Sequence, residues 1–285
     1  MKFTTCRLLV FLPIPNLAFA EKMQTVESDK SHYNLFTPVP DALLRDFDTD
    51  RPDKANSPRT LDAGRFQIET GFGSYSRNKD SGVLSENFSW ADTTLRMGLN
   101  SWAELQLEVP PFQENRSTNT ASKATRVNGG MGDLAFLFKT NFWGNDEGRS
   151  AAGMAVSMKL PTASHQISNG KVEGSILFLT DFKLAGDFDL GINNGVGIAA
   201  NDQGCHDVNV VNVISLSHQI IGPVSGYTEF FSSIPTTHGH DWEGTIDTGL
   251  LWIVNKKFQV DVGVNFGVTD SASDLQTFVG ASCRF

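Results

Sequence analysis

The clearest pattern in the chain is the run Phe258-Gln-Val-Asp-Val-Gly-Val-Asn-Phe-Gly-Val-Thr269, in which apolar residues alternate with polar residues or glycine. Neighbouring side chains of a β-strand point to opposite faces, so this period of two predicts a strand with one apolar and one polar face. The same alternation recurs at 187–198, 133–142 and 103–109. No convincing amphipathic helix accompanies it, so the predicted fold class is all-β.

The alternating pattern predicts about twelve strands between residues 64 and 285. We expect their centres near residues 70, 93, 106, 137, 155, 178, 193, 212, 228, 248, 263 and 280. Short connections lie near 100–101, 144–145, 185–186, 221–222 and 255–256, and longer ones near 77–85, 113–130, 161–171, 200–207, 235–241 and 269–274. An even strand number with alternating short turns and long loops is typical of an antiparallel up-and-down transmembrane barrel of the bacterial outer membrane.

A soluble β-sandwich is the competing fold, because its strands alternate as well. The polar face favours the barrel, since it carries glycines and charges of both signs, as a crowded barrel interior would. The final strand favours it too, and its expected outward face is Leu275, Thr277, Val279, Ala281, Cys283 and Phe285. This ending, with Gly280 and the aromatic Phe285, resembles the signal read by the barrel-assembly machinery. That machinery and outer-membrane lipid are expected partners of the barrel.

Composition excludes several other classes of protein. The 285 residues include 23 Lys and Arg against 32 Asp and Glu, a formal charge of −9, which argues against a nucleic-acid partner. No run approaches the roughly 18 apolar residues of a membrane-spanning helix. Three cysteines are too few for a disulfide-built scaffold or a four-cysteine zinc site.

Residues 1–20 have the pattern of an export signal peptide. Lys2 and Arg7 precede the apolar run 8–12, and Ala18-Phe-Ala20 is a small-x-small cleavage signal. Without those two cations, the exported chain keeps 21 basic against 32 acidic residues, a charge of −11. The expected location is the bacterial outer membrane.

Residues 21–63 differ from everything after them. They are polar, hold four prolines and show no sustained period. We expect an irregular segment on the periplasmic side or inside the lumen, where it is either a plug or a tail. The barrel domain then takes residues 64–285.

Seven motifs carry a resemblance to a known family. They are Thr37-Pro-Val-Pro-Asp-Ala-Leu-Leu-Arg-Asp-Phe-Asp-Thr-Asp-Arg-Pro-Asp53, Asp62-Ala-Gly-Arg-Phe-Gln-Ile-Glu-Thr70, Ala91-Asp-Thr-Thr-Leu-Arg-Met-Gly98, Gly132-Asp-Leu134, Lys159-Leu-Pro-Thr162, Val172-Glu-Gly174 and the ending 278–285. Together they resemble the outer-membrane transporters grouped as the "MetA-pathway of phenol degradation" family, over about residues 35–285. The resemblance implies a transporter barrel for small molecules, aromatic or hydrophobic compounds among them.

Charged residues on the inward face are the candidate pore lining. The acidic ones are Glu69, Asp92, Glu104, Glu108, Asp133, Glu173, Asp181, Asp189, Glu229, Glu243, Asp247 and Asp261. The basic ones are Arg65, Arg96, Lys139, Lys159, Lys183 and Arg284. Twelve carboxylates against six cations predict a lumen of net negative sign. These groups can brace the barrel as ion pairs, because unpaired buried charge is costly, or line a polar path that tolerates cations. Both roles can coexist.

An enzymatic barrel is the first alternative function. Ser164-His-Gln-Ile-Ser-Asn-Gly170 comes close to the His-x-Ser-Asn-Gly motif of outer-membrane phospholipases, whose His and Ser share one strand face. Here an extra residue puts His165 and Ser168 on opposite faces of a strand. We therefore expect a polar outer loop and no enzyme.

Two further patterns could hold a metal ion. His238-Gly-His-Asp241 places two imidazoles on one face of an extended chain, but no third ligand is evident. Asp46-Phe-Asp-Thr-Asp-Arg-Pro-Asp53 spaces carboxylates as a calcium loop does. However, Arg51 stands where the loop needs glycine and Ser57 where it needs glutamate. We expect no metal and no cofactor.

The predicted function is a channel or transporter that passes a small-molecule solute through a narrow, net-negative barrel. Barrels of about eight strands are filled by side chains and those of 16–18 conduct freely, so about twelve strands predict a narrow or gated path. The alternatives are a phospholipase-like enzyme and a non-conducting structural or binding barrel. Cys205 in an outer loop and Cys283 at the periplasmic rim are predicted to be free thiols. An apolar band about 25 Å tall separates them, whereas a disulfide needs Cα atoms within about 7 Å.

Overall fold

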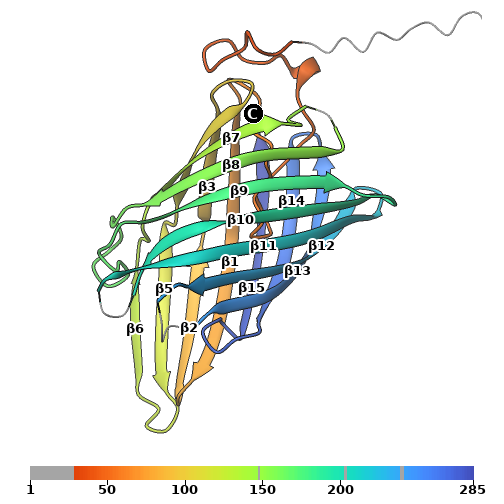
Figure 1. Cartoon of the computed structure of the whole chain (residues 1–285). Coiled ribbons are helices and arrows are strands. Elements are labelled where there is room, and N and C mark those ends of the chain that lie inside the picture. The colour runs from red at the N-terminus through yellow and green to blue at the C-terminus, as the bar shows by residue number, and fades with distance from the viewer. Residues whose placement is uncertain (1–28, 147, 202–203, 238–240) are drawn as a thin grey trace, which may run out of the picture.

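The structure is a computed structural model that describes residues 29–146, 148–201, 204–237 and 241–285. The predicted signal peptide therefore lies outside the described residues. One short 3-10 helix, η1 (Asp41–Leu43), precedes fifteen strands (Figure 1). The strands are β1 (Phe66–Asp80), β2 (Val83–Trp90), β3 (Asp92–Gly98), β4 (Ala103–Val109), β5 (Phe112–Asn119), β6 (Thr125–Gly130), β7 (Ala135–Trp143), β8 (Ser150–Lys159), β9 (Glu173–Lys183), β10 (Phe188–Ala200), β11 (His206–Ile221), β12 (Val224–Pro235), β13 (Glu243–Asn255), β14 (Phe258–Gly267) and β15 (Leu275–Arg284).

The sheet closes into a barrel because the first strand pairs with the last. β1 lies antiparallel to β15, with Gln67 opposite Arg284, and the Phe285 N–H donates to the Phe66 carbonyl at 2.8 Å. The ring runs β1, β3, β4, then β7 to β15, which makes twelve antiparallel strands. The prediction of an all-β barrel of about twelve strands is confirmed, and the sandwich alternative is wrong.

Three of the predicted strands are longer than expected, and each is divided in two. β2 and β3, β4 and β5, and β6 and β7 follow one another along single strand paths. Ala91, with φ of 58°, separates the first pair, and Pro110-Pro111 separates the second. A left-handed residue and residues without an N–H both interrupt a hydrogen-bond ladder. The strand paths therefore bend at these points.

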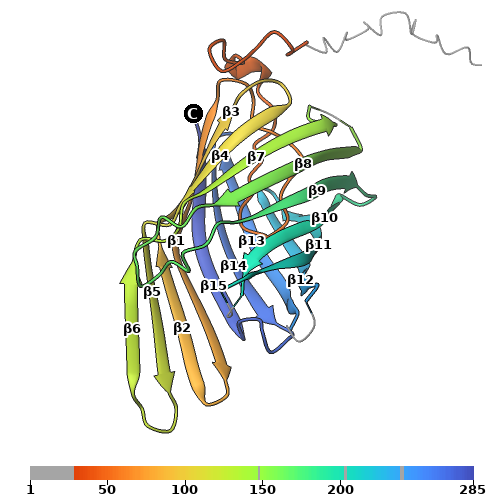
Figure 2. The same cartoon turned by 60° about the vertical axis from the view of Figure 1, so that its left-hand side comes forward.

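The predicted long loops at 77–85 and 113–130 are corrected by the structure, because they are mostly strand. β1 turns into β2 through Ser81 and Gly82, both with positive φ, as a tight hairpin requires. Residues 74–80 of β1, with β2, β5 and β6, form a four-stranded sheet that continues the wall beyond the ring, here called the extension (Figure 2). Its strands lack a simple apolar face, which is why the sequence suggested loops.

Apolar side chains point outward and charged ones point inward. Among outward residues, Phe178 is 58% exposed and Trp252 is 52% exposed, whereas inward Glu104 and Lys139 are fully buried. At the base of the extension, the outward rings of Phe88 and Trp90 stack with centroids 5.7 Å apart. This inside-out distribution suits a barrel whose outer surface meets lipid. None of the helices in the described part of the chain is long and apolar enough to span a membrane.

The N-terminal segment enters the barrel from the end with short turns, where the C-terminus also lies (Figure 1). Residues 45–62, here called the inserted segment, have no regular secondary structure and hydrogen-bond to inward side chains of many strands. The assignment of residues 21–63 to the periplasmic side or the lumen stays a prediction.

Cysteine labelling tests the sidedness of the barrel. Cys205 is exposed in the β10–β11 turn at the long-loop end, and Cys283 lies near the end of β15 in the outward row; both are free thiols. An impermeant maleimide added to intact cells should label Cys205 and leave Cys283 unlabelled until the protein is denatured. The Cys205→Ser variant should abolish the cell-surface label. If Cys283 is labelled on intact cells and Cys205 is not, the barrel has the opposite orientation in the membrane, and this prediction is wrong.

Candidate functional site

A buried cluster of charges lies on the wall built by β1, β3, β4 and β7. Arg96 donates to Glu69 at 2.8 Å and to Glu104 at 2.9 Å, and the Lys139 ammonium lies 3.6 Å from Glu104. All four side chains are at most 1% exposed. Two cations therefore balance two carboxylates within the wall itself, as buried charge requires.

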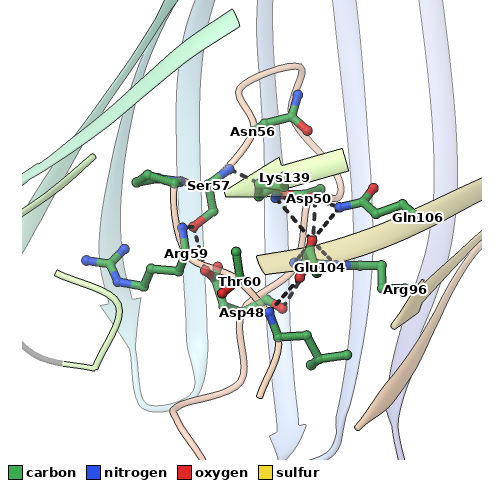
Figure 3. Close-up of polar contacts among 12 residues, drawn as sticks. Asp48, Asp50, Asn56, Ser57, Arg59, Thr60, Arg96, Glu104, Gln106 and Lys139 are labelled. Carbon is green, nitrogen blue, oxygen red and sulfur yellow. Dashed lines mark hydrogen bonds and ion pairs between the residues drawn. The ribbon is translucent and has the colours of Figure 1, made fainter. Parts of the chain in front are cut away.

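Asp50 of the inserted segment adds a third carboxylate to this cluster. It accepts from Lys139 at 2.6 Å and from the Gln106 amide at 2.7 Å, and it lies 3.5 Å from Arg96 (Figure 3). Burial by itself raises the pKa of Asp50, but the nearby Arg96 and Lys139 outweigh it and hold that pKa at about 2. Asp50 is therefore ionised at every physiological pH and ties the segment to this wall.

Cations of the inserted segment contact the opposite wall, which is acidic. Arg51 lies 2.8 Å from Asp261 of β14, Lys54 lies 3.2 Å from Asp247 of β13, and Arg59 lies 2.8 Å from Asp181 of β9. The backbone N–H groups of Lys54 and Ala55 donate to Glu229 of β12 at 2.9 and 2.8 Å. The segment thus supplies cations and N–H donors to four strands that carry carboxylates.

Glycines on β1 and β15 make room for Arg51. A side chain at Gly280 would collide with the Arg51 guanidinium, and one at Gly71 would come within 3.1 Å of it. The guanidinium also lies over the Phe278 ring, 6.0 Å from its centroid. Gly280, predicted as part of an assembly signal, therefore has a local packing role that its position in the sequence does not reveal.

Asp53 lies in a different environment from Asp50. Its carboxylate accepts from the Ser215 hydroxyl at 3.1 Å. Burial raises the pKa of Asp53 to about 7, and the negative charges of Asp50 and Asp181 add to the rise. The segment therefore carries one carboxylate that is firmly ionised and one that titrates near neutral pH.

The inserted segment lies between two cavities of the lumen. A cavity of about 450 Å³ opens at the short-turn end, and Arg45, Lys183, Asp189 and Arg284 are among its lining residues. A second cavity, of about 440 Å³, lies toward the long-loop end, and Asn56 is its contact with the segment. We call it the outer cavity. Asn56 is fixed by reciprocal bonds with Asn193 of β10, at 2.6 and 3.1 Å.

The predicted inward residues separate into groups in the structure. Glu69, Arg96, Glu104 and Lys139 form the buried cluster, and Asp181, Glu229, Asp247 and Asp261 contact the segment. Lys159, Asp133 and Glu173 form an ion-pair group at the long-loop end, with Lys159 2.9 Å from Asp133. Arg284 donates to backbone carbonyls of the segment, whereas Glu108, Lys183 and Asp189 line cavities. Asp92 begins β3 beside Gly71, Arg65 binds Asp41 at the rim, and Glu243 begins β13.

The sequence did not reveal which residues of the inserted segment contact the barrel wall from inside. Asp50, Arg51, Lys54 and Arg59 lie in a proline-containing stretch without periodicity, so they suggested a solvated linker. The alternation of charge sign along 50–59 is the one signal that could have singled them out.

The enzyme and metal alternatives find no support in the described residues. The Ser168 hydroxyl donates to Asp133 at 3.1 Å, and His165 is exposed in the same loop. The carboxylates of the calcium-like stretch bind protein cations and hydroxyls instead of converging, and no metal-type cluster of His, Cys, Asp or Glu occurs among the described residues. His238 and His240 lie outside those residues.

Comparison with known proteins places the fold. A family model described as "Putative MetA-pathway of phenol degradation" matches residues 49–285. An outer membrane channel from Pseudomonas putida F1 is similar in structure, with a TM-score of 0.58 and 10% identity, over 84% of this chain and 100% of that one. The NanC porin matches with a TM-score of 0.48, 8% identity and coverage of 76% and 98%. No curated protein matches this chain in sequence.

The Asp50 contacts generate a prediction about docking of the inserted segment. Asp50→Asn should weaken docking by about 2 kcal/mol, because hydrogen bonds to charged groups contribute about 1.5–3 kcal/mol each. Limited proteolysis of the detergent-solubilised protein within residues 45–62 should then accelerate by more than tenfold. Asp46→Asn is the matched control, since its backbone carbonyl and not its carboxylate accepts from Arg284. Equal rates in the two variants would contradict the anchoring role.

Asp53 predicts a pH dependence of the same docking. The pKa of Asp53 is about 7 when docked and about 3.9 when free, so docking is favoured at low pH. As the pH rises from about 4 to 7, the docking equilibrium constant falls by at most about tenfold per pH unit. Above pH 7 the contribution of Asp53 no longer changes. Asp50, with its lowered pKa, loses its own contribution only below about pH 4. Proteolysis rates should therefore rise with pH between 5 and about 7 and level off toward pH 8, and Asp53→Asn should flatten the profile.

Proposed function

Because the chain belongs to the "MetA-pathway of phenol degradation" family, whose model covers most of it, we propose that it is an outer-membrane channel for small molecules. Its inserted segment is the gate. The single observation that supports this role is the double attachment of that segment, through Asp50 to the buried cluster of Arg96 and Lys139 and through Arg51, Lys54 and Arg59 to an acidic wall. The likeness in fold to an outer membrane channel gives further support.

The attachment suits a gate better than a permanent part of the wall. The side chains of Arg51, Lys54 and Arg59 are 21–28% exposed, so water reaches these ion pairs. Ion pairs that keep contact with water contribute little each. Removal of the segment would leave the twelve-stranded hydrogen-bond ladder intact, since β1 to β15 pair with one another and not with residues 45–62.

The wall predicts the selectivity of the open state. With the segment displaced, the carboxylates of Asp181, Glu229, Asp247 and Asp261 face the lumen without their partners. Rings of carboxylates favour cations in narrow pores. We therefore propose that the open channel prefers cations and neutral polar solutes over anions.

A conductance measurement tests this proposal. The triple variant Arg51→Ala, Lys54→Ala, Arg59→Ala should raise the open fraction in planar bilayers. Partly hydrated ion pairs contribute at most about 1 kcal/mol each, so the three together contribute up to about 3 kcal/mol. A loss of that size shifts a two-state equilibrium up to about 100-fold. A KCl gradient should give a reversal potential of cation-selective sign.

The control removes three cations that lie on the extension, Arg116→Ala, Lys123→Ala, Arg126→Ala. It should conduct as the unchanged protein does, because these residues do not touch the inserted segment. If the first triple variant inserts as a heat-modifiable barrel and conducts no better than this control, the gating role of the inserted segment is refuted. If none of these proteins conducts, the channel proposal fails as well. A non-conducting structural or binding barrel would then be the better description.

A further inference from the structure

The outer cavity has two unlike walls. Its apolar wall is made of Leu137, Ala155, Leu177 and Val211, from β7, β8, β9 and β11. Leu137 and Ala155 also pack with the fully buried Leu179. These are the inward positions where a charged or polar residue would be expected in an aqueous pore. Their presence gives this part of the lumen an apolar surface.

Glycine and alanine on β10 create the volume of this cavity. Gly197 and Ala199 project inward between the larger side chains of β9 and β11. A Cβ added at Gly197 would lie 3.8 Å from a methyl of Val211 and 3.5 Å from the Gly174 carbonyl, which is ordinary contact. A larger side chain there would occupy the cavity without straining the backbone.

The other wall is acidic and contains one carboxylate with no partner among the described residues. Glu108, near the end of β4, is exposed, and its side chain makes no hydrogen bond or ion pair with the described residues. The remaining charges are Lys159 with Asp133 and Glu173, and Lys159 lies within 3.0 Å of both carboxylates. Three carboxylates against one cation give the cavity two net negative charges.

We infer that the outer cavity binds a small organic cation, namely a protonated amine on an aromatic or alkyl body, with Glu108 as its counter-ion. An apolar wall and an unpaired carboxylate in one recess of about 440 Å³ match a ligand that has both features. The inference rests on the proposed function, because it names the class of solute that would reach the gate. Asn56 of the inserted segment is one of the residues that line the outer cavity.

Calorimetric titration of the full-length protein in detergent tests the inference without any measurement of conductance. Three probes separate its parts: phenethylammonium has the charge and the ring, 2-phenylethanol has the ring alone, and ethylammonium has the charge with little apolar surface. Phenethylammonium should bind most tightly. Its affinity should exceed each of the others about tenfold or more, since a hydrogen bond to a charged group contributes about 1.5–3 kcal/mol.

Two variants and a control locate the site. Glu108→Gln should weaken phenethylammonium about tenfold and leave 2-phenylethanol unchanged. Gly197→Val should abolish binding of both ring-containing probes by filling the recess. Asp270→Asn, an exposed acidic residue of the β14–β15 loop, should change nothing.

Equal affinity for ethylammonium and phenethylammonium would reduce the site to a non-specific cation attraction and overturn the inference. Unchanged affinity in Glu108→Gln would overturn it as well. The result is independent of the channel proposal: a protein that binds the amine but never conducts contradicts the proposed function alone, and one that conducts without binding contradicts this inference alone.

Discussion

Charge that is taken out of bulk water needs a partner at close range, and this constraint organises the interior of the barrel. The wall built by β1, β3, β4 and β7 meets the constraint within itself, with Arg96 and Lys139 against Glu69 and Glu104. The wall built by β9 and β12 to β14 does not meet this constraint by itself, because the charged groups that face the inserted segment there are all carboxylates. Its partners come from the inserted segment, where Asp50 pairs with the first wall and the neighbouring Arg51 pairs with Asp261 of the second.

The architecture was largely predictable because the solvent on each side of the wall leaves a mark in the sequence. Lipid outside and a polar lumen inside force side chains to alternate, so runs such as 258–269 indicate strands directly. The extension was missed because its inner face is mainly Ser, Asn and Gln and its outer face mixes aromatic rings with charges. Glu86 and Arg116 interrupt the apolar row that contains Phe88. Beyond the apolar band, neither face has to be apolar, and the period-two signal fades.

The wall side of the site was also predictable, whereas its partners were not. Alternation alone placed Glu229, Asp247 and Asp261 on the inward face. Their contacts with Ala55, Lys54 and Arg51 join residues 174 to 210 positions apart. Nothing local fixes such a register. The inserted segment has no hydrogen-bond ladder of its own, so the positions of its residues depend on the wall that surrounds them, and the wall exists only in the folded barrel.

The inserted segment is held unevenly, and this bears on how a gate of this kind can open. At one wall, Asp50 is about 10% exposed and bonds to side chains that are fully buried, so its charge-assisted bonds are strong. At the other wall, the three cations stay partly hydrated, and pairs of that kind are weak one by one. Water and small cations can replace Arg51, Lys54 and Arg59 at modest cost, whereas no neutral solute can replace Asp50 between Lys139 and Arg96. Opening should therefore begin at the acidic wall, with the segment pivoting about Asp50, and a path along Asp181, Asp247 and Asp261 would form before the segment leaves the lumen.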